Sequence, residues 1–298
     1  MIALLAAGAA FALTGPFRDN GDNGRDTHPT TTTSTAAPVT GAAASTCRTP
    51  LTSTDPLRLW IGGDSLAGSL GPSLGDLTGK TGVVQPVFDA RASSGLLSRG
   101  FLDWPKHAGD DMSLYNPEVT VFIIGANDAE NIAEGTVRDP TWRAQYAALV
   151  EEMLTALRGN GRAVYWIGAP VMADAGYSQR VQGVNEVFRD VAARHPDVTY
   201  VDAYTAFSGP DGSFASTLPV PGGGVVRVRG ADGIHFTPEG GDLLARQVFD
   251  QLDPACKVAQ QAVPGVTKPT IEVQGSTSVP GTRRGPTTAT SRPATRGG

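Results

Sequence analysis

Residues 119–124 read VTVFII and are followed directly by GAND at 125–128. A nearly continuous apolar run of this kind is typical of a parallel strand that helices bury on both faces. Shorter runs rich in apolar and β-branched residues lie on either side of it along the chain, at residues 57–61, 83–92, 163–169 and 198–202. We therefore expect a sheet of five strands built around residues 119–124.

Helical patterns fill most of the segments between these strands. Leucines recur at helical spacing after residue 65, and apolar side chains mark one face of residues 142–157 and 181–191. A last helix opens with Thr237 as N-cap and Pro238 as first residue. Strands that alternate with helices predict an α/β domain with a mainly parallel sheet covered on both faces. Ligands of such sheets bind at the carboxyl ends of the strands.

The segments that flank this domain have a different composition. Residues 17–54 are rich in Thr, Ala, Pro and Ser, and the last part of the chain is rich in Thr, Pro, Gly and basic residues. Such segments offer few large apolar side chains whose burial could offset the entropy cost of ordering. We predict one domain at residues 55–256, between a disordered linker at 17–54 and a disordered basic tail at 257–298.

The net charge of −5 is unevenly distributed. From Lys257 onward the chain carries six basic side chains against Glu272 alone, so the acidic excess lies in the domain. An acidic domain is a poor match for the phosphate backbone, which argues against nucleic acid as a partner. The basic tail either contacts an anionic polymer or membrane surface or is a solvated linker.

Both ends of the chain indicate export. Residues 1–13 read MIALLAAGAAFAL, which is shorter than the ~20 residues of a membrane-spanning helix and lacks the basic residues that precede a signal-peptide core. Residues 1–16 are therefore a signal peptide or the end of a membrane anchor, and the domain is secreted or anchored at the cell envelope. Cys47 and Cys256, the two cysteines, flank the domain. They form a disulfide that joins its ends, which an oxidising compartment favours, or remain two thiols.

A serine and a histidine are the first candidates for chemistry. Ser65 follows two glycines and Asp64 at the end of the first expected strand, where a helix begins and its backbone N–H groups are unpaired. His235 is the one histidine of four that lies in a suitable loop, three residues after Asp232, whose carboxylate can orient its ring. In isolation, Ser65 is better explained as a helix N-cap, and Asp232 with Gly233 is equally well explained as an ordinary turn beside a histidine at a helix end.

Two further segments could supply hydrogen-bond donors to an oxyanion. Asn127 follows the most apolar strand and offers a side-chain N–H without bringing charge, and Gly125 permits close approach. Gly95, in SSGLL at 93–97, offers a backbone N–H after the second expected strand. Asn, Ser and Gly also fill ordinary turns, so each signal is weak when taken alone.

Taken in order along the chain, the four segments resemble the four blocks of the SGNH (GDSL-like) hydrolase family, which contribute Ser, Gly, Asn and His. The matches are GDSL at 63–66, Gly95, GAND at 125–128 and DGIH at 232–235. The resemblance spans about residues 57–252 and implies a three-layer α/β/α, flavodoxin-like fold.

The resemblance also assigns roles. It implies that Ser65 is the nucleophile, His235 the base and Asp232 the group that orients His235. The backbone N–H groups of Ser65 and Gly95, with the side chain of Asn127, would form the oxyanion hole. The motifs look like those of the exported bacterial subgroup, in which related domains are fused to membrane acyltransferases that acylate cell-surface glycans. Here that multi-helix portion is absent, which weakens the transferase inference or means that the membrane acyltransferase is a separate chain.

Two functions of different classes remain open. The first is acyl-ester chemistry through an acyl-enzyme, either hydrolysis or transfer to a hydroxyl, on an acylated small molecule or surface polysaccharide. The second is a non-catalytic wall- or glycan-associated module that retains the fold. We expect a monomer without metal or cofactor, because no Cys/His cluster has metal-ligand spacing and no phosphate-binding glycine loop is present.

Overall fold

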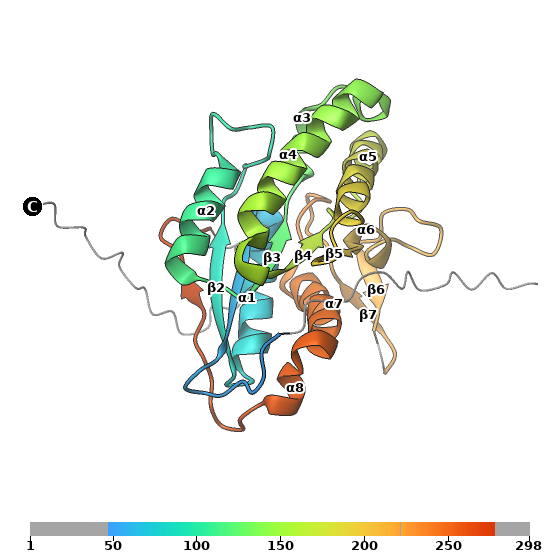
Figure 1. Ribbon diagram of the computed structural model, residues 1–298. Helices are drawn as coiled ribbons and strands as arrows, with labels where there is room; N and C mark the ends of the chain where they lie inside the picture. The colour runs from blue at the N-terminus through green and yellow to red at the C-terminus, as the bar shows by residue number, and fades with distance from the viewer. Residues whose placement is uncertain (1–46, 221, 278–298) are drawn as a thin grey trace, which may run out of the picture. The chain divides into compact units, whose positions relative to one another are not determined.

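The computed structural model describes residues 47–220 and 222–277 (Figure 1). The predicted leader or anchor at 1–16 lies outside the described residues, as do residues 17–46 of the predicted linker and 278–298 of the predicted tail.

A six-stranded sheet with strand order β5-β4-β3-β1-β2-β8 forms the centre of the domain, and every neighbouring pair in it is parallel. Its strands are β1 (Leu57–Gly63), β2 (Val84–Ala90), β3 (Val119–Ile123), β4 (Ala163–Ile167), β5 (Val198–Val201) and β8 (Ile271–Glu272). A separate antiparallel hairpin consists of β6 (Thr217–Pro219) and β7 (Val225–Arg227). The five predicted strands are thus confirmed, and β8 is a sixth that was not predicted.

Helices cover both faces of this sheet. The α-helices are α1 (Ser65–Gly79), α2 (Trp104–Tyr115), α3 (Ala126–Asn131), α4 (Pro140–Arg158), α5 (Ala175–Ala192), α6 (Ala203–Ala206), α7 (Pro238–Cys256) and α8 (Val258–Gln261). Short 3₁₀ turns lie at Thr136–Arg138 and Gly159–Gly161. Helices α1 and α7 pack together on one face, and α2, α4 and α5 cover the other (Figure 1). The predicted three-layer α/β/α fold is confirmed.

The central strand β3 is buried along its whole length, as its apolar sequence predicts. Phe122 of β3 is the centre of an aromatic cluster, and its ring centroid lies 5.1 to 6.1 Å from those of Trp60, Trp104 and Trp166. These three indole rings come from β1, α2 and β4, so the cluster packs helix α2 against the three strands β1, β3 and β4.

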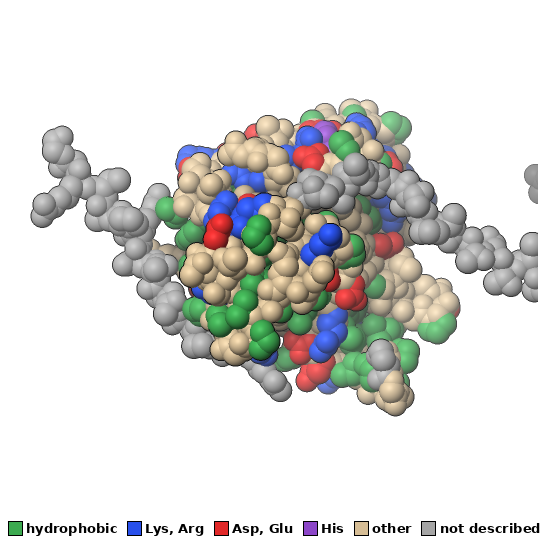
Figure 2. Space-filling model, turned by 60° about the horizontal axis from the view of Figure 1, so that its bottom comes forward, with side chains coloured by type: hydrophobic (Ala, Val, Ile, Leu, Met, Phe, Trp, Pro, Cys, Tyr) green, Lys and Arg blue, Asp and Glu red, His purple; other side chains and the backbone are tan. Residues whose placement is uncertain are grey.

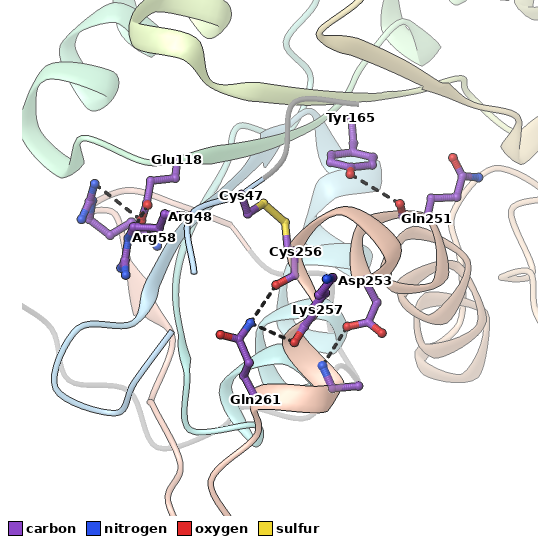
Figure 3. Close-up of a disulfide and its surroundings, with 11 residues drawn as sticks. Cys47, Arg48, Arg58, Glu118, Tyr165, Gln251, Asp253, Cys256, Lys257 and Gln261 are labelled. Carbon is purple, nitrogen blue, oxygen red and sulfur yellow. Dashed lines mark hydrogen bonds and ion pairs between the residues drawn. A yellow bond between two sulfur atoms is a disulfide. The ribbon is translucent and has the colours of Figure 1, made fainter. Parts of the chain in front are cut away.

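At the amino ends of the strands, Cys47 and Cys256, which lie 209 positions apart in the sequence, form the predicted disulfide (Figure 3). The side-chain amide of Gln261 donates to the carbonyl oxygens of Cys256 and Lys257 at 3.0 Å, and its oxygen accepts from the backbone N–H of Leu51 at 2.7 Å. The two ends of the domain are therefore joined by hydrogen bonds as well as by the covalent bond.

The predicted limits of the linker and tail are wrong for the residues that the structure describes. Residues 47–54 and 257–277 belong to the domain: Leu51 and Val258 are buried in the core, and β8 pairs with β2. The backbone N–H of Val273 donates to Phe88 O, and that of Thr277 donates to Ala90 O, each at 2.9 Å. In a Thr- and Pro-rich segment these few apolar and strand-forming positions give no clear signal, because each gains its partner only when the segment packs against the domain.

Side chains of both charges are interspersed over the face seen in Figure 2, and neither sign dominates it. Among the residues that the structure describes, no helix has the length and apolar character needed to cross a membrane.

Candidate active site

Ser65 is the first residue of α1, directly beyond the carboxyl end of β1. The turn requires glycine at position 63, because Gly63 has φ +143° and a Cβ there would lie 1.8 Å from the carbonyl oxygen of Ile123. The Asp64 carboxylate caps the helix by accepting from Leu66 N at 2.9 Å. The predicted strand, turn and helix around Ser65 are present, with the serine at the start of the helix.

The loop before α7 brings Asp232 and His235 to Ser65. His235 Nε2 lies 2.8 Å from Ser65 Oγ, and His235 Nδ1 lies 2.7 Å from Asp232 Oδ2. The other carboxylate oxygen, Oδ1, accepts from the backbone N–H groups of Ile234 and His235 at 2.9 and 3.0 Å. The three residues thus form a continuous hydrogen-bonded chain, although 170 positions separate Ser65 from His235.

Electrostatics keep the Asp232 carboxyl ionised. Partial burial acts to raise its pKa, but the hydrogen bonds from the His235 ring and from the two backbone N–H groups outweigh burial and lower the pKa to about 2. A negative charge is therefore present beside the imidazole throughout the neutral range, which fixes the ring with its Nδ1–H toward Asp232 and leaves Nε2 facing Ser65.

Asn127 and Gly95 lie on the two loops next to this chain. Asn127 Nδ2 donates to Ser94 O at 2.8 Å and lies 3.5 Å from Asp64 Oδ2, so its amide is directed between the serine turn and the 93–97 loop. Within residues 47–220 and 222–277, the backbone N–H groups of Ser65 and Gly95 donate to no other group. All of the predicted site residues thus belong to loops or helix starts at the carboxyl ends of the strands.

Asp128 holds the 93–97 loop in place, a role that the sequence did not suggest. Its carboxylate oxygens accept from the backbone N–H groups of Leu96 at 3.0 Å and Leu97 at 2.9 Å, and from Tyr146 Oη at 2.7 Å. Only glycine fits at position 95, because a Cβ there would lie 2.2 Å from Asp128 Oδ1. The acidic residue of GAND is therefore a support for Gly95 and not only part of a turn.

Trp104 also supports this loop. It is fully buried, and its Nε1–H donates to Ser94 Oγ at 2.9 Å. The side chain therefore packs beneath the loop.

Burial raises the pKa values of Asp64 and Asp128, the two buried carboxyl groups beside Ser65 and the 93–97 loop. The pKa of Asp64 is raised to about 7, mainly by burial, against the hydrogen bond from Leu66 N, which lowers it. Burial likewise raises the pKa of Asp128, while the hydrogen bonds from Leu97 N and Tyr146 oppose that rise. Neither carboxyl has a basic side chain within ion-pair distance among the described residues.

A group of three side chains that could hold a cation lies apart from these residues. Oxygen or nitrogen atoms of Asp89, His107 and Asp111 all lie within 4.8 Å of one another. Arg91 Nε lies 2.6 Å from Asp89 Oδ1, and Trp60 Nε1 donates to Asp111 Oδ2 at 3.1 Å. The protein thus supplies its own cation to this cluster. His107 and Asp111 belong to α2 and Asp89 to β2, so the packing of α2 against the end of β2 brings the three side chains together.

The structure is similar to several solved structures. A GDSL-like lipase from Bacteroides thetaiotaomicron is 14% identical and has a TM-score of 0.48, with 66% of this chain and 88% of that chain covered. An acetyl esterase is 16% identical at a TM-score of 0.48, over 68% of this chain and 99% of that chain. An acetyl xylan esterase is 15% identical at a TM-score of 0.45, over 65% and 98%.

At the level of sequence, no curated protein is similar enough to count as a match. One family does match, and the match extends from residue 58 to residue 251, which is nearly the whole domain. The chain belongs to the family described as "Protein of unknown function (DUF459)".

Proposed function

We propose that this protein is a serine-dependent acyl-ester hydrolase or acyltransferase of the SGNH type. The observation that carries the proposal is the hydrogen-bonded chain from Asp232 through His235 to Ser65 Oγ, with distances of 2.7 and 2.8 Å. A nucleophile, a base in contact with it and a third group that orients the base are the arrangement that covalent acyl transfer requires.

The first half of the reaction uses all three residues. Ser65 Oγ attacks the carbonyl carbon of the ester while its proton passes to His235 Nε2. The ionised Asp232 carboxylate stabilises the imidazolium that forms. The tetrahedral intermediate then collapses, the C–O bond to the alcohol breaks, and the departing alcohol takes the proton from His235. Ser65 is left as an acyl ester.

The charge that develops on the carbonyl oxygen needs donors that are already in place. The backbone N–H groups of Ser65 and Gly95 and the side-chain N–H of Asn127 fill this role in the proposal, because each belongs to a turn or loop beside Ser65. Preorganised donors of this kind are worth more than donors that must reorient, since no reorganisation accompanies the reaction.

The second half of the reaction decides between the two activities. His235 takes a proton from water or from a sugar hydroxyl as that oxygen attacks the acyl carbon. The bond between the acyl carbon and Ser65 Oγ then breaks and Oγ takes the proton back from His235, which releases a carboxylic acid or an acylated sugar and restores the free serine. The substrate we propose is an O-acylated glycan of the cell surface, met outside the cytoplasm, with a membrane acyltransferase as a separate partner chain. The disulfide supports the extracytoplasmic location, because disulfides persist in oxidising compartments. A monomer without metal or cofactor is sufficient for this chemistry.

Replacement of Ser65 tests the step that both activities share. We expect the full chain to release nitrophenol from 4-nitrophenyl acetate, and Ser65→Ala to lower kcat by about 10⁴-fold or more. Ser73→Ala, on the same helix two turns further on, serves as the matched control and should retain activity.

A non-catalytic module is the competing explanation, and labelling separates the two. A fluorophosphonate reacts with a serine that an adjacent base activates, so it should modify Ser65 in the wild-type chain and leave the Ser65→Ala chain unlabelled. A wild-type chain that neither turns over the ester nor becomes labelled would remove the enzymatic proposal. Mass spectrometry of products formed with an acetylated polysaccharide then distinguishes water from a sugar hydroxyl as the acceptor.

A further inference from the structure

Arg229 is a fully buried arginine that lies two residues after the end of β7 and three residues before Asp232. It forms no ion pair with any carboxylate among the described residues. Burial lowers its pKa to about 10, and the negative charge of Asp232 opposes that shift, so the guanidinium is still protonated at neutral pH. A buried cation without a paired anion is costly, and such groups are retained where their hydrogen bonds are needed.

The hydrogen bonds of Arg229 join two segments of the chain. Its Nη1 donates to Val171 O at 2.6 Å, in the segment after β4. Its Nη2 donates to Ile234 O at 2.6 Å and to Gly233 O at 3.4 Å, in the loop between Asp232 and His235. The guanidinium thus holds the carbonyl groups of the two residues that separate the acid from the base.

Further hydrogen bonds and ring contacts hold this loop around Arg229. The backbone N–H of Gly230 donates to His235 O at 2.7 Å, and that of Ala173 donates to Gly233 O at 3.1 Å. The guanidinium carbon lies 5.3 Å from the centre of the Phe236 ring and 5.2 Å from that of Phe214. Phe236 follows His235 directly, so Arg229 contacts the chain on both sides of the histidine.

We propose that Arg229 is a positioning residue, which fixes the 230–236 loop so that His235 Nε2 is held within hydrogen-bond distance of Ser65 Oγ. This inference rests on the proposed function and adds a residue to it. A guanidinium suits the task because its planar fork presents several donors in fixed directions, and a charged donor makes stronger hydrogen bonds than a neutral one. Lysine offers a point charge and cannot span both carbonyl groups in the same way.

The experiment compares Arg229 with Arg162, a second buried arginine. Arg162 also donates to carbonyl oxygens, those of Pro117 at 3.0 Å and Met112 at 3.4 Å, but it precedes β4 at the opposite end of the sheet. In the full chain, Arg229→Met should lower kcat on 4-nitrophenyl acetate by about 10²-fold with little change in KM, because a base displaced by about 1 Å loses that much. Arg162→Met should lower the Tm but retain kcat at temperatures where the chain is folded.

Arg229→Lys is included in case the methionine variant does not fold. It keeps the charge, and we expect an intermediate loss of kcat. In the Asp232→Ala background, Arg229→Met should cost clearly less than it does in the wild type, because the orientation of His235 is already impaired. Losses that multiply without interaction, or a wild-type kcat in both Arg229 variants, would overturn the inference.

Hydrogen–deuterium exchange tests the same inference without any reference to activity. The amides of Gly230, Ile234 and His235 are all hydrogen-bonded within the loop, and their exchange should be faster in Arg229→Met or Arg229→Lys than in the wild type or in Arg162→Met. If the wild-type chain proves to have no esterase activity, the proposed function fails, whereas unchanged exchange in the loop overturns the role of Arg229 itself.

Discussion

At the amino ends of the strands, Arg48 Nε lies 2.6 Å from Glu118 Oε1, Arg58 Nη2 lies 3.5 Å from Glu118 Oε2, and a disulfide lies close by (Figure 3). At the carboxyl ends, Asp64 and Asp128 are buried with no basic side chain in ion-pair contact among the described residues. The first region is partly exposed to water, and its charges are paired. In the second region these two carboxyl groups are buried and are met chiefly by backbone N–H groups, with Tyr146 Oη as an added donor to Asp128.

This difference shows where the fold gains stability and where it loses some. The disulfide restricts the conformations of the unfolded chain, and the ion pairs stabilise the folded chain modestly. Buried carboxyl groups held mainly by backbone N–H groups are unfavourable by themselves, but they fix the turns around Ser65 and Gly95. We therefore expect changes at the amino ends to lower stability without loss of activity, and changes at the carboxyl ends to lower activity or to remove an unfavourable buried charge. Three experiments can test this division.

Reduction of the disulfide should have the largest effect on stability. The bond closes a loop of 209 residues, for which the chain-entropy relation gives a loss of about 5 kcal/mol in the free energy of unfolding. Urea unfolding of the oxidised and the reduced wild-type chain measures this loss. A chain with both Cys47→Ala and Cys256→Ala is the control, because reductant should leave its stability unchanged.

With the proposed esterase activity as the readout, the same reduced chain should keep its kcat at 25 °C as long as it is folded. The disulfide lies at the amino ends of the strands, away from Ser65 and His235 at the carboxyl ends. A reduced, folded chain with a much lower kcat would break the division between the two ends of the sheet.

The strands and the positions of Ser65 and His235 were predictable because their signals are local. An apolar run such as that of β3 marks a buried strand by its composition, and Ser65 and His235 each adjoin a strand end or a helix start that the sequence displays. The supports of the site were not predictable, because they join distant segments. Asp128 accepts a hydrogen bond from Leu96, 32 positions away in the sequence, and Arg229 donates one to Val171, 58 positions away. No local sequence pattern predicts such pairs. The pairing of β8 with the edge strand β2 could not be predicted for the same reason.

Titration of Asp64 should have the next largest effect on the free energy of unfolding. Its pKa is raised to about 7 in the folded chain, above its ordinary value of 3.8, so between about pH 4 and pH 7 the folded state binds a proton that the unfolded state has released. The contribution of Asp64 to the free energy of unfolding therefore decreases as the pH rises through this window and is lowest above pH 7. A shift of this size corresponds to about 4 kcal/mol.

Asp64→Asn removes this titration and keeps an acceptor for the helix cap, since asparagine caps helices as well as aspartate does. Urea unfolding at several pH values should show that the variant gains stability relative to the wild type between pH 4 and pH 8. Parallel stability curves for the two chains would contradict the raised pKa. They would also mean that burial of the Asp64 carboxylate does not destabilise the folded chain.

Loss of the Asn127 side chain should have the smallest effect of the three in free energy, and it should appear in activity instead of stability. If Asn127 Nδ2 donates to the oxyanion, Asn127→Ala should lower kcat by about 10²- to 10³-fold, which corresponds to about 3–4 kcal/mol of transition-state stabilisation, with KM little changed. Asn131→Ala on the same short helix is the matched control, because Asn131 Nδ2 donates to Asn127 O at 2.7 Å and not to the site. Equal losses in both variants would mean that α3 is merely disturbed, and the oxyanion role would pass to the backbone N–H groups of Ser65 and Gly95 alone. A loss confined to Asn127→Ala, with the Tm unchanged, would show that this end of the sheet is specialised for chemistry even where it contributes little to stability.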